Sequence, residues 1–291
     1  MKKIKNIPKR YFILSLICFL VMIICILYET NIFFIVKNFI FNAEYRENFT
    51  LAESNIKTNI NIFQVIHQVI SNYDWRFDYS IIFGTNFFQL ILPCIVSISG
   101  LVFYNKYHNI YNFSIHRNQN YKKYIQKEIR NESIKTSLSV FSAFLFFYII
   151  IIVITKGKLS TYSMDRSLFL DVFGTSFYYA NPYLYYLLDG LVRFFLIPFI
   201  YTYFSCSVSI IAKSKKQVFF ISNIYYYGLS VIGFGLYYIF GENAIYINPS
   251  VIMASGSYSN VNTILLLFVS LIPLLIGNII LRGKNHAKEI Y

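Results

Sequence analysis

Six long apolar runs constrain this chain more than any other feature. They cover residues 11–28, 82–103, 138–154, 184–212, 217–240 and 263–281. A helix of about 20 residues crosses the hydrocarbon core of a bilayer. Lipid offers the backbone no hydrogen bonds, so a crossing segment is a helix or part of a closed barrel, and these runs are too long for barrel strands. The sequence therefore predicts an all-α polytopic membrane protein with six transmembrane helices.

The basic residues are distributed unevenly among the connections. Most of the 26 Lys and Arg residues lie in the N-terminal segment, in the connection 105–137, directly after the fourth run and in the C-terminal tail. Most of the 13 acidic residues lie in the other connections. Loops rich in Lys and Arg stay in the cytoplasm. We therefore expect both termini to be cytoplasmic, with an even number of spans, in a multi-pass protein of the cell membrane.

Length and charge exclude several classes of protein. The 291 residues contain no polar stretch long enough for a separate catalytic domain, so we expect residues 1–291 to form one transmembrane domain. The net charge of +13 does not indicate a nucleic-acid partner, because the excess lies beside the predicted spans, where topology and anionic headgroups explain it. The four cysteines lie within apolar runs and form no CxxC motif, so we expect no exterior disulfide.

Motifs for catalysis are missing from the sequence. The phosphate-binding motif GxxxxGK[ST] does not occur, and Gly157-Lys158-Leu159-Ser160 lacks its upstream glycine and its hydroxyl spacing. The zinc motif HExxH does not occur either, and the four histidines are scattered. We therefore expect no enzyme activity, no metal and no cofactor.

Asp189 and Arg193 are the ionisable residues that fall well within a predicted span. Because they are four residues apart, they share a helix face and can pair along one turn. Charges at that depth are costly unless they are paired or face water, so an intramembrane charge pair is a candidate functional site. The alternative is a pair that only neutralises itself near the outer end of the fourth helix.

The exterior segments contain further apolar patterns. Within the exterior segment 29–80, residues 31–41 either prolong the first helix or lie on the outer surface. Residues 56–70 have apolar side chains at helical spacing, which predicts an amphipathic helix. This helix either lies at the membrane interface or packs on the second exterior loop. The last exterior loop, 241–262, leaves room for a short re-entrant or interfacial element.

The connection 105–137 is expected to be a cytoplasmic loop with a basic amphipathic helix at its end. One helical face holds Tyr121, Tyr124, Ile125, Glu128 or Ile129, and Glu132, and the opposite or flanking positions hold Lys122, Lys123, Lys127 and Arg130. Such a helix can lie on anionic headgroups or dock a cytoplasmic partner. The alternative is a solvated loop whose charge only sets the topology.

Several of these features occur together in one known family. The second run contains a proline in Phe87-Phe88-Gln89-Leu90-Ile91-Leu92-Pro93, the basic loop has the form R-x-x-x-Y-x-x-Y from Arg117, and a short basic turn follows the fourth run. With these motifs, six spans and a large exterior segment, the chain resembles the membrane subunits (permeases) of type-2 ATP-binding-cassette exporters of Gram-positive bacteria. It departs from them after the second span, where Lys106 lies in a region in which these permeases often carry an acidic residue.

The resemblance implies a partner and a mechanism. The chain would form a homodimer, or pair with a second permease, within membrane lipid, and each membrane subunit would bind a separate P-loop ATPase. The coupling to this ATPase would fall to Arg117, Tyr121, Lys122, Lys123, Tyr124, Ile125, Lys127 and Glu128. The exported compound would be a peptide, a lipid-like molecule or an antimicrobial.

Two other classes of function stay open. An ion-coupled secondary carrier needs buried carboxylates in several spans, and among the spans only the fourth supplies one, Asp189. A non-transporting accessory or immunity protein shares the layout of a permease, and the sequence does not distinguish it.

Overall fold

The computed structural model describes residues 9–46, 61–111, 121–160, 170–253 and 262–286. Of these residues 89% are helical and none forms a strand. Six of the helical segments are long and apolar enough to cross a membrane. This confirms the expected class, an all-α polytopic membrane protein. The six segments are Lys9–Glu29, Phe88–Asn109, Lys123–Thr155, Pro182–Ile211, Lys215–Ile247 and Ile264–Gly283.

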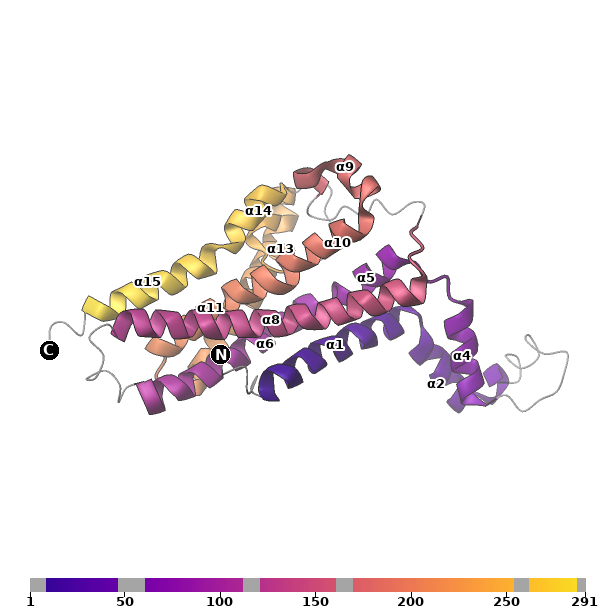
Figure 1. The fold of residues 1–291 in the computed structure, drawn as a ribbon, viewed down its shortest axis with the longest axis horizontal. Helices are drawn as coiled ribbons and strands as arrows, with labels where there is room; N and C mark the ends of the chain where they lie inside the picture. Colours follow the sequence, from indigo (N-terminus) through magenta and orange to yellow (C-terminus); the bar gives the residue numbers. More distant parts are fainter. Residues whose placement is uncertain (1–8, 47–60, 112–120, 161–169, 254–261, 287–291) are drawn as a thin grey trace, which may run out of the picture.

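The spans form an elongated bundle in which the chain repeatedly reverses direction (Figure 1). Helix α1 (Lys9–Glu29) and helix α8 (Tyr121–Thr155) both begin toward the left of the view, where α15 (Ile272–His286) ends. We call this end the basic end, because Arg10 and Lys106 lie there together with the start of α8. Helices α2 (Ile32–Phe41) and α4 (Ile62–Asn72) lie at the opposite end.

Helix α11 (Ile197–Ile211) is the centre of the bundle. It packs against α6 (Phe88–Lys106), α8, α12 (Lys215–Asn223) and α15. Nearly all of its side chains are buried, including Ser205, Ser207 and Ser209. Small residues let membrane helices approach closely, and at Gly100 of α6 an added Cβ would lie 2.1 Å from the Ser205 Oγ atom. The serines of α11 therefore set how closely its neighbours pack.

Four of the six spans are interrupted in their course. The second run divides at Phe87 into α5 (Phe77–Asn86) and α6, and the sixth divides at Leu271 into α14 (Thr263–Ser270) and α15. Proline explains the second of these breaks, because Pro273 cannot donate the helical hydrogen bond. The fourth and fifth spans each contain a π turn. In the fourth span, Val192–Leu196 joins α10 (Pro182–Leu191) to α11. In the fifth span, Ile224–Gly228 joins α12 to α13 (Leu229–Phe240).

The segment after α13 folds back into the bundle. A short 3₁₀ helix (Gly241–Ile247) leads to a turn in which Val251, Ile252 and Met253 are buried in the main core. At Gly233, in the first half of α13, an added Cβ would lie 2.7 Å from the Cβ atom of Asn248. The described part of the connection 241–262 therefore packs into the bundle.

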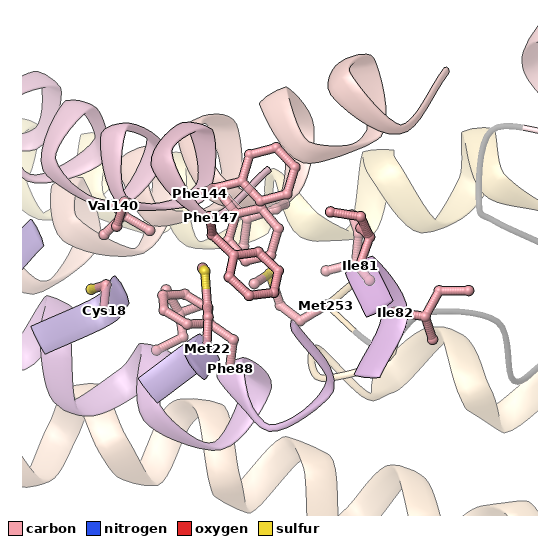
Figure 2. Packing of buried hydrophobic residues seen from close by; sticks show 14 of the residues in the cluster. Cys18, Met22, Ile81, Ile82, Phe88, Val140, Phe144, Phe147 and Met253 are labelled. Carbon is pink, nitrogen blue, oxygen red and sulfur yellow. The ribbon is translucent and has the colours of Figure 1, made fainter. Parts of the chain in front are cut away.

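The main core gathers side chains from most of the spans. Figure 2 shows Phe144 and Phe147 of α8 at its centre, with Met22 of α1, Phe88 of α6 and Met253 of the turn after the 3₁₀ helix close to them. All of these side chains are buried. Helices α1 and α8, the start of α6 and the turn that contains Met253 thus meet in one part of the core.

The first exterior segment does not continue α1. Asn31 has a left-handed backbone, with φ of 57°, and it ends α1 before α2 begins. Helix α4 begins at Ile62, and residues 56–60 of the expected amphipathic helix lie outside the described residues. Helix α4 packs on α2, whereas the described part of the second exterior segment, α9 (Leu170–Ala180), packs on α10 and α14.

More of the connection 105–137 is helical than the sequence predicts. Helix α6 runs into a π turn over Tyr107–Tyr111, and α8 already begins at Tyr121. The expected separate helix is therefore the first part of a continuous helix of 35 residues. The physical reason is that no Gly or Pro interrupts the sequence from Tyr121 to Thr155.

We predict that Gly190→Ala destabilises the bundle. The added methyl group would lie 2.0 Å from the ring of Phe144, where α10 packs on α8. Overpacking of this kind costs about 1–3 kcal/mol. Thermal unfolding in detergent measures the loss, and Gly235→Ala is the control, because no atom lies within 4 Å of its added Cβ. Equal melting of the two variants would contradict this packing.

Candidate functional site

Asp189 and Arg193 form a buried ion pair in the fourth span. The Arg193 Nε atom donates to Asp189 Oδ1 at 3.1 Å and lies 3.0 Å from Oδ2. Only 1% of the arginine side chain and 10% of the aspartate side chain are exposed. Asp189 lies in α10 and Arg193 in the π turn that follows, and both face the interior of the bundle.

Phe194, next to this pair in the sequence, packs against aromatic side chains of two other helices. Phe194, the next residue after Arg193, stacks on Phe144 with 4.6 Å between ring centroids. Its other face meets Phe88 edge-on at 5.2 Å, directly after the break between α5 and α6. The π turn adds one residue to the helical turn, so two consecutive side chains, Arg193 and Phe194, both point into the core. The charge pair therefore lies where two spans are interrupted.

The guanidinium group of Arg193 is not fully satisfied by the described residues. Its Nη2 atom is buried and has no hydrogen-bond partner among them. A buried donor without a partner costs about 1–3 kcal/mol, and more when it carries charge. A pair that served only to neutralise itself would not need this arrangement, and a buried ionisable group in a span is a functional candidate by default.

A second group of charges, whose pairing was not predicted, lies at the basic end. The carboxylate of Glu132 is buried, with 3% of the side chain exposed. It accepts a hydrogen bond from the Tyr11 hydroxyl at 2.6 Å, and it pairs with Arg10 and with Lys106, whose Nζ atom lies 3.0 Å from Oε2. These partners come from α1 and α6, whereas Glu132 belongs to α8. One carboxylate thus joins three helices, and we call these four residues the Glu132 clamp.

The signal for the clamp was present in the sequence. Glu132 lies seven residues after Ile125, so both belong to the same helical face. A carboxylate on an apolar face requires a cation, and Lys106 provides one from the end of α6. The contact was not predicted because the sequence does not show which helix ends meet.

The residues expected to contact an ATPase divide into two groups. Ile125 and Ile129 are buried in a cluster with Phe103, Tyr107 and Leu281, and Tyr121 and Tyr124 pack against this cluster. Ile125 is thus covered by the chain itself and Tyr121 and Tyr124 are partly covered, while the docking role expected for these three residues stays a prediction.

Basic side chains lie on the exposed face at the start of α8. Lys123, Lys127 and Arg130 are exposed and share one stripe of α8. Glu128 is partly exposed. Arg117 and the side chain of Lys122 lie outside the described residues. The part of the predicted coupling site that can reach a partner is therefore this stripe, which we call the α8 basic stripe.

Tyr121 marks the start of the covered face. Burial, followed by the neighbouring Tyr107 hydroxyl, raises the pKa of Tyr121 well above its ordinary value. The hydroxyl therefore stays protonated at physiological pH and can donate a hydrogen bond within the cluster.

Polar contacts also connect the helices around α11. The Asn223 side chain donates to Ser97 at 2.9 Å, and Ser222 donates to Ser205 at 2.9 Å. Ser99 and Thr136 share a hydrogen bond of 2.9 Å between α6 and α8. Hydrogen bonds between membrane helices are each worth about 0.6 kcal/mol on average, so these contacts fix the packing more than they stabilise it.

Within the described part of the chain, no three His, Cys, Asp or Glu side chains come together in a way that could hold a metal ion. The cysteines Cys18, Cys25, Cys94 and Cys206 are free thiols. No family model, no curated protein and no solved structure matches the chain.

We predict that Glu132→Gln destabilises the protein by about 2 kcal/mol, because it leaves Arg10 and Lys106 without their counter-charge. Thermal unfolding in detergent measures the change. Adding Lys106→Met to this variant should restore part of the stability by removing one uncompensated cation. The control is Glu44→Gln, the same change at an exposed position of the opposite end. The clamp would be refuted by equal melting of the Glu132 and Glu44 variants.

We predict strong coupling between Asp189 and Arg193. Either Asp189→Leu or Arg193→Met alone leaves one buried charge unpaired, which costs about 3–5 kcal/mol. The double variant removes both charges, so it should be more stable than either single variant. The measurement is a double-mutant cycle of unfolding free energies. Additive losses would show that the two side chains do not interact.

Proposed function

We propose that this chain is the membrane subunit of a transporter that is driven by a separate P-loop ATPase, with the basic end in the cytoplasm. One observation carries the proposal. Helix α8 runs without interruption from the exposed α8 basic stripe to Phe144 and Phe147 at the centre of the core. A partner that moves the start of this helix acts directly on the middle of the bundle.

The Glu132 clamp would transmit such a movement to other helices. It joins α8 to α1 and α6 near the start of α8, within two to three turns of the stripe. Because the carboxylate is buried, its ion pairs are screened less by salt than those on an exposed surface. A displacement of α8 would therefore carry the ends of α1 and α6 with it.

The interrupted spans provide the parts that can bend. Backbone breaks and π turns are the usual positions of kinks in helices. Phe144 of α8 contacts Phe194, which in turn contacts Phe88, so the breaks of two spans adjoin the helix that would be moved. Irregular backbone buried in a bundle is also typical of transporters, in which it lines the path of the substrate.

The exposed surface of the bundle supports a proposal for the assembly and for the substrate class. Many apolar side chains are exposed along the spans, as at Phe146 and Ile149 of α8, where lipid or a second subunit would cover them. A homodimer, or a pair with a second permease, would close such a surface. A peptide or lipid-like compound, an antimicrobial included, fits export along a path of this kind.

An ion-coupled carrier is the weaker candidate. Among the described residues, Asp78, Glu132 and Asp189 are the buried carboxylates. Glu132 and Asp189 pair with cations, and Asp78 accepts a hydrogen bond from the Ser160 amide at 3.1 Å. Each of these carboxylates already has a partner within the chain, whereas an ion-coupled carrier needs carboxylates that are available to bind its ion.

We predict that the protein, purified gently from its native membranes, retains a P-loop ATPase in near-equal amount, identified by mass spectrometry. The combined variant Lys123→Glu, Lys127→Glu and Arg130→Glu should lose it, because the α8 basic stripe changes sign. The matched control is Lys37→Glu, Lys156→Glu and Lys158→Glu, with the same change of charge at the opposite end.

Each outcome of this experiment decides a separate point. If the intact wild-type protein retains no ATPase, the proposed function is wrong and an accessory protein or a carrier remains. If the ATPase is retained by both triple variants, the transporter assignment stands but the stripe is not its docking surface.

A further inference from the structure

Helices α2 and α4 lie across the bundle at the end opposite the basic end. Helix α2 turns away from α1 at the left-handed residue Asn31, directly after the first span (Figure 1). In the same view α4 runs across the direction of α8. With 10 and 11 residues these helices are too short to cross a bilayer. Both therefore lie at the level where the spans leave the hydrocarbon core.

Each helix has a buried face and an exposed apolar face. Val65 of α4 is fully buried, and so are Ile32 and Phe39 of α2, because α2 packs on both α1 and α4. The buried faces attach the pair to the bundle. On the remaining surface Phe41 is 81% exposed and Phe63 is 74% exposed.

The exposed side of α4 has a mainly apolar stripe and a polar stripe. Phe63 and Ile70 share one stripe with a single polar residue, His67, between them, whereas Gln64, the partly exposed Gln68 and Ser71 form a polar stripe beside it. The exposed arc of α2 consists of Phe33, Phe34, Ile40 and Phe41, with Lys37 as its single charge. Separate apolar and polar stripes on an exposed surface are typical of a helix at a boundary between apolar and aqueous media. A helix whose exposed surface contacts only water does not need them.

Lipid is the occupant that the surroundings favour. The exposed apolar residues of α1, among them Ile24 and Tyr28, belong to a membrane span, and α2 follows them after a single turn. The apolar surface thus continues from the span onto α2. Lys37 lies within the exposed face, where a long side chain can extend to a phosphate headgroup.

Arg46 keeps the end of α2 compatible with this position. Its Nε atom donates to the carbonyl of Phe39 at 2.9 Å and its Nη2 atom to that of Ile40 at 2.7 Å. Carbonyl groups at the end of a helix would otherwise lack partners at the edge of the hydrocarbon region. The same guanidinium lies 5.7 Å from the centre of the Phe39 ring.

We propose that α2 and α4 form an in-plane anchor. The apolar faces of both helices rest in the boundary between the headgroups and acyl chains of the leaflet at this end of the bundle. Their ligand is phospholipid, with Lys37 directed to its phosphate. This inference does not depend on the proposed transport function, because any six-span protein with this surface would bind lipid in the same way.

Tryptophan fluorescence tests the anchor directly. The chain has a single tryptophan, Trp75, so Trp75→Phe provides a silent background. Phe63→Trp and Phe34→Trp then place a probe on the apolar face of each helix. Gln64→Trp is the matched control, one residue from Phe63 but on the polar stripe. Each variant is reconstituted in vesicles of phosphatidylcholine and phosphatidylglycerol with or without brominated acyl chains.

We expect brominated lipid to quench Phe63→Trp and Phe34→Trp by at least half, with little quenching by aqueous iodide. Gln64→Trp should show the opposite behaviour. Strong iodide quenching at all three positions would overturn the anchor in favour of free helices in water. Protection from both quenchers would overturn it in favour of a second copy or a partner protein. If Phe63→Trp does not fold, Ile70→Trp on the same stripe takes its place and is judged by the same criteria.

Discussion

The buried carboxylate of Glu132 is the interaction on which the arrangement of the basic end depends. Alone at that depth it would be expensive, because desolvation disfavours a charge without a partner. It is tolerated because α1 and α6 each bring a cation to it, and Tyr11 adds a hydrogen bond. One side chain therefore joins the ends of α1 and α6 to the first third of the long helix α8.

The two ends of the molecule are built from different interactions. At the basic end the outer surface is charged and the inner contacts are ionic, as the α8 basic stripe and the Glu132 clamp show. At the other end the outer surface is aromatic, and Phe41 and Phe63 are among its most exposed residues. A charged end can receive a polar partner from water, whereas an aromatic end is stabilised by an apolar phase. The chain thus separates the charged end, where we propose that a partner docks, from the aromatic end, where we propose that lipid binds.

Much of this fold could be predicted from the sequence, because hydrophobic length alone identifies a span in lipid. All six apolar runs coincide with membrane-spanning segments of the structure. Their boundaries were harder to predict. Helix α5 begins at Phe77, before its apolar run, because the Phe77 amide donates to the Lys158 carbonyl and Asp78 accepts from Ser160. Such contacts between distant segments leave no mark in a hydropathy pattern.

The candidate site could likewise be predicted only in part from the sequence. The pairing of Asp189 with Arg193 follows from their spacing, since residues four apart meet on a helix. The Glu132 clamp required knowledge of which helix ends meet, because the sequence placed Glu132 on a helical face without showing which cations lie opposite it. The π turn at Val192–Leu196 was also unpredictable, because no residue type specifies it.

The position of the buried charge pair has a consequence for how this bundle can change shape. The π turn at Arg193 and the break at Phe87 both weaken the backbone ladder at one level of the bundle. A bundle that separated there would expose polar groups to lipid unless side chains could replace the lost partners. Arg193 supplies donors at that level, with one nitrogen not yet used by the described residues. The pair therefore lies at the level where two spans are interrupted, and the Nη2 atom without a partner among the described residues adds to the cost of burying it there.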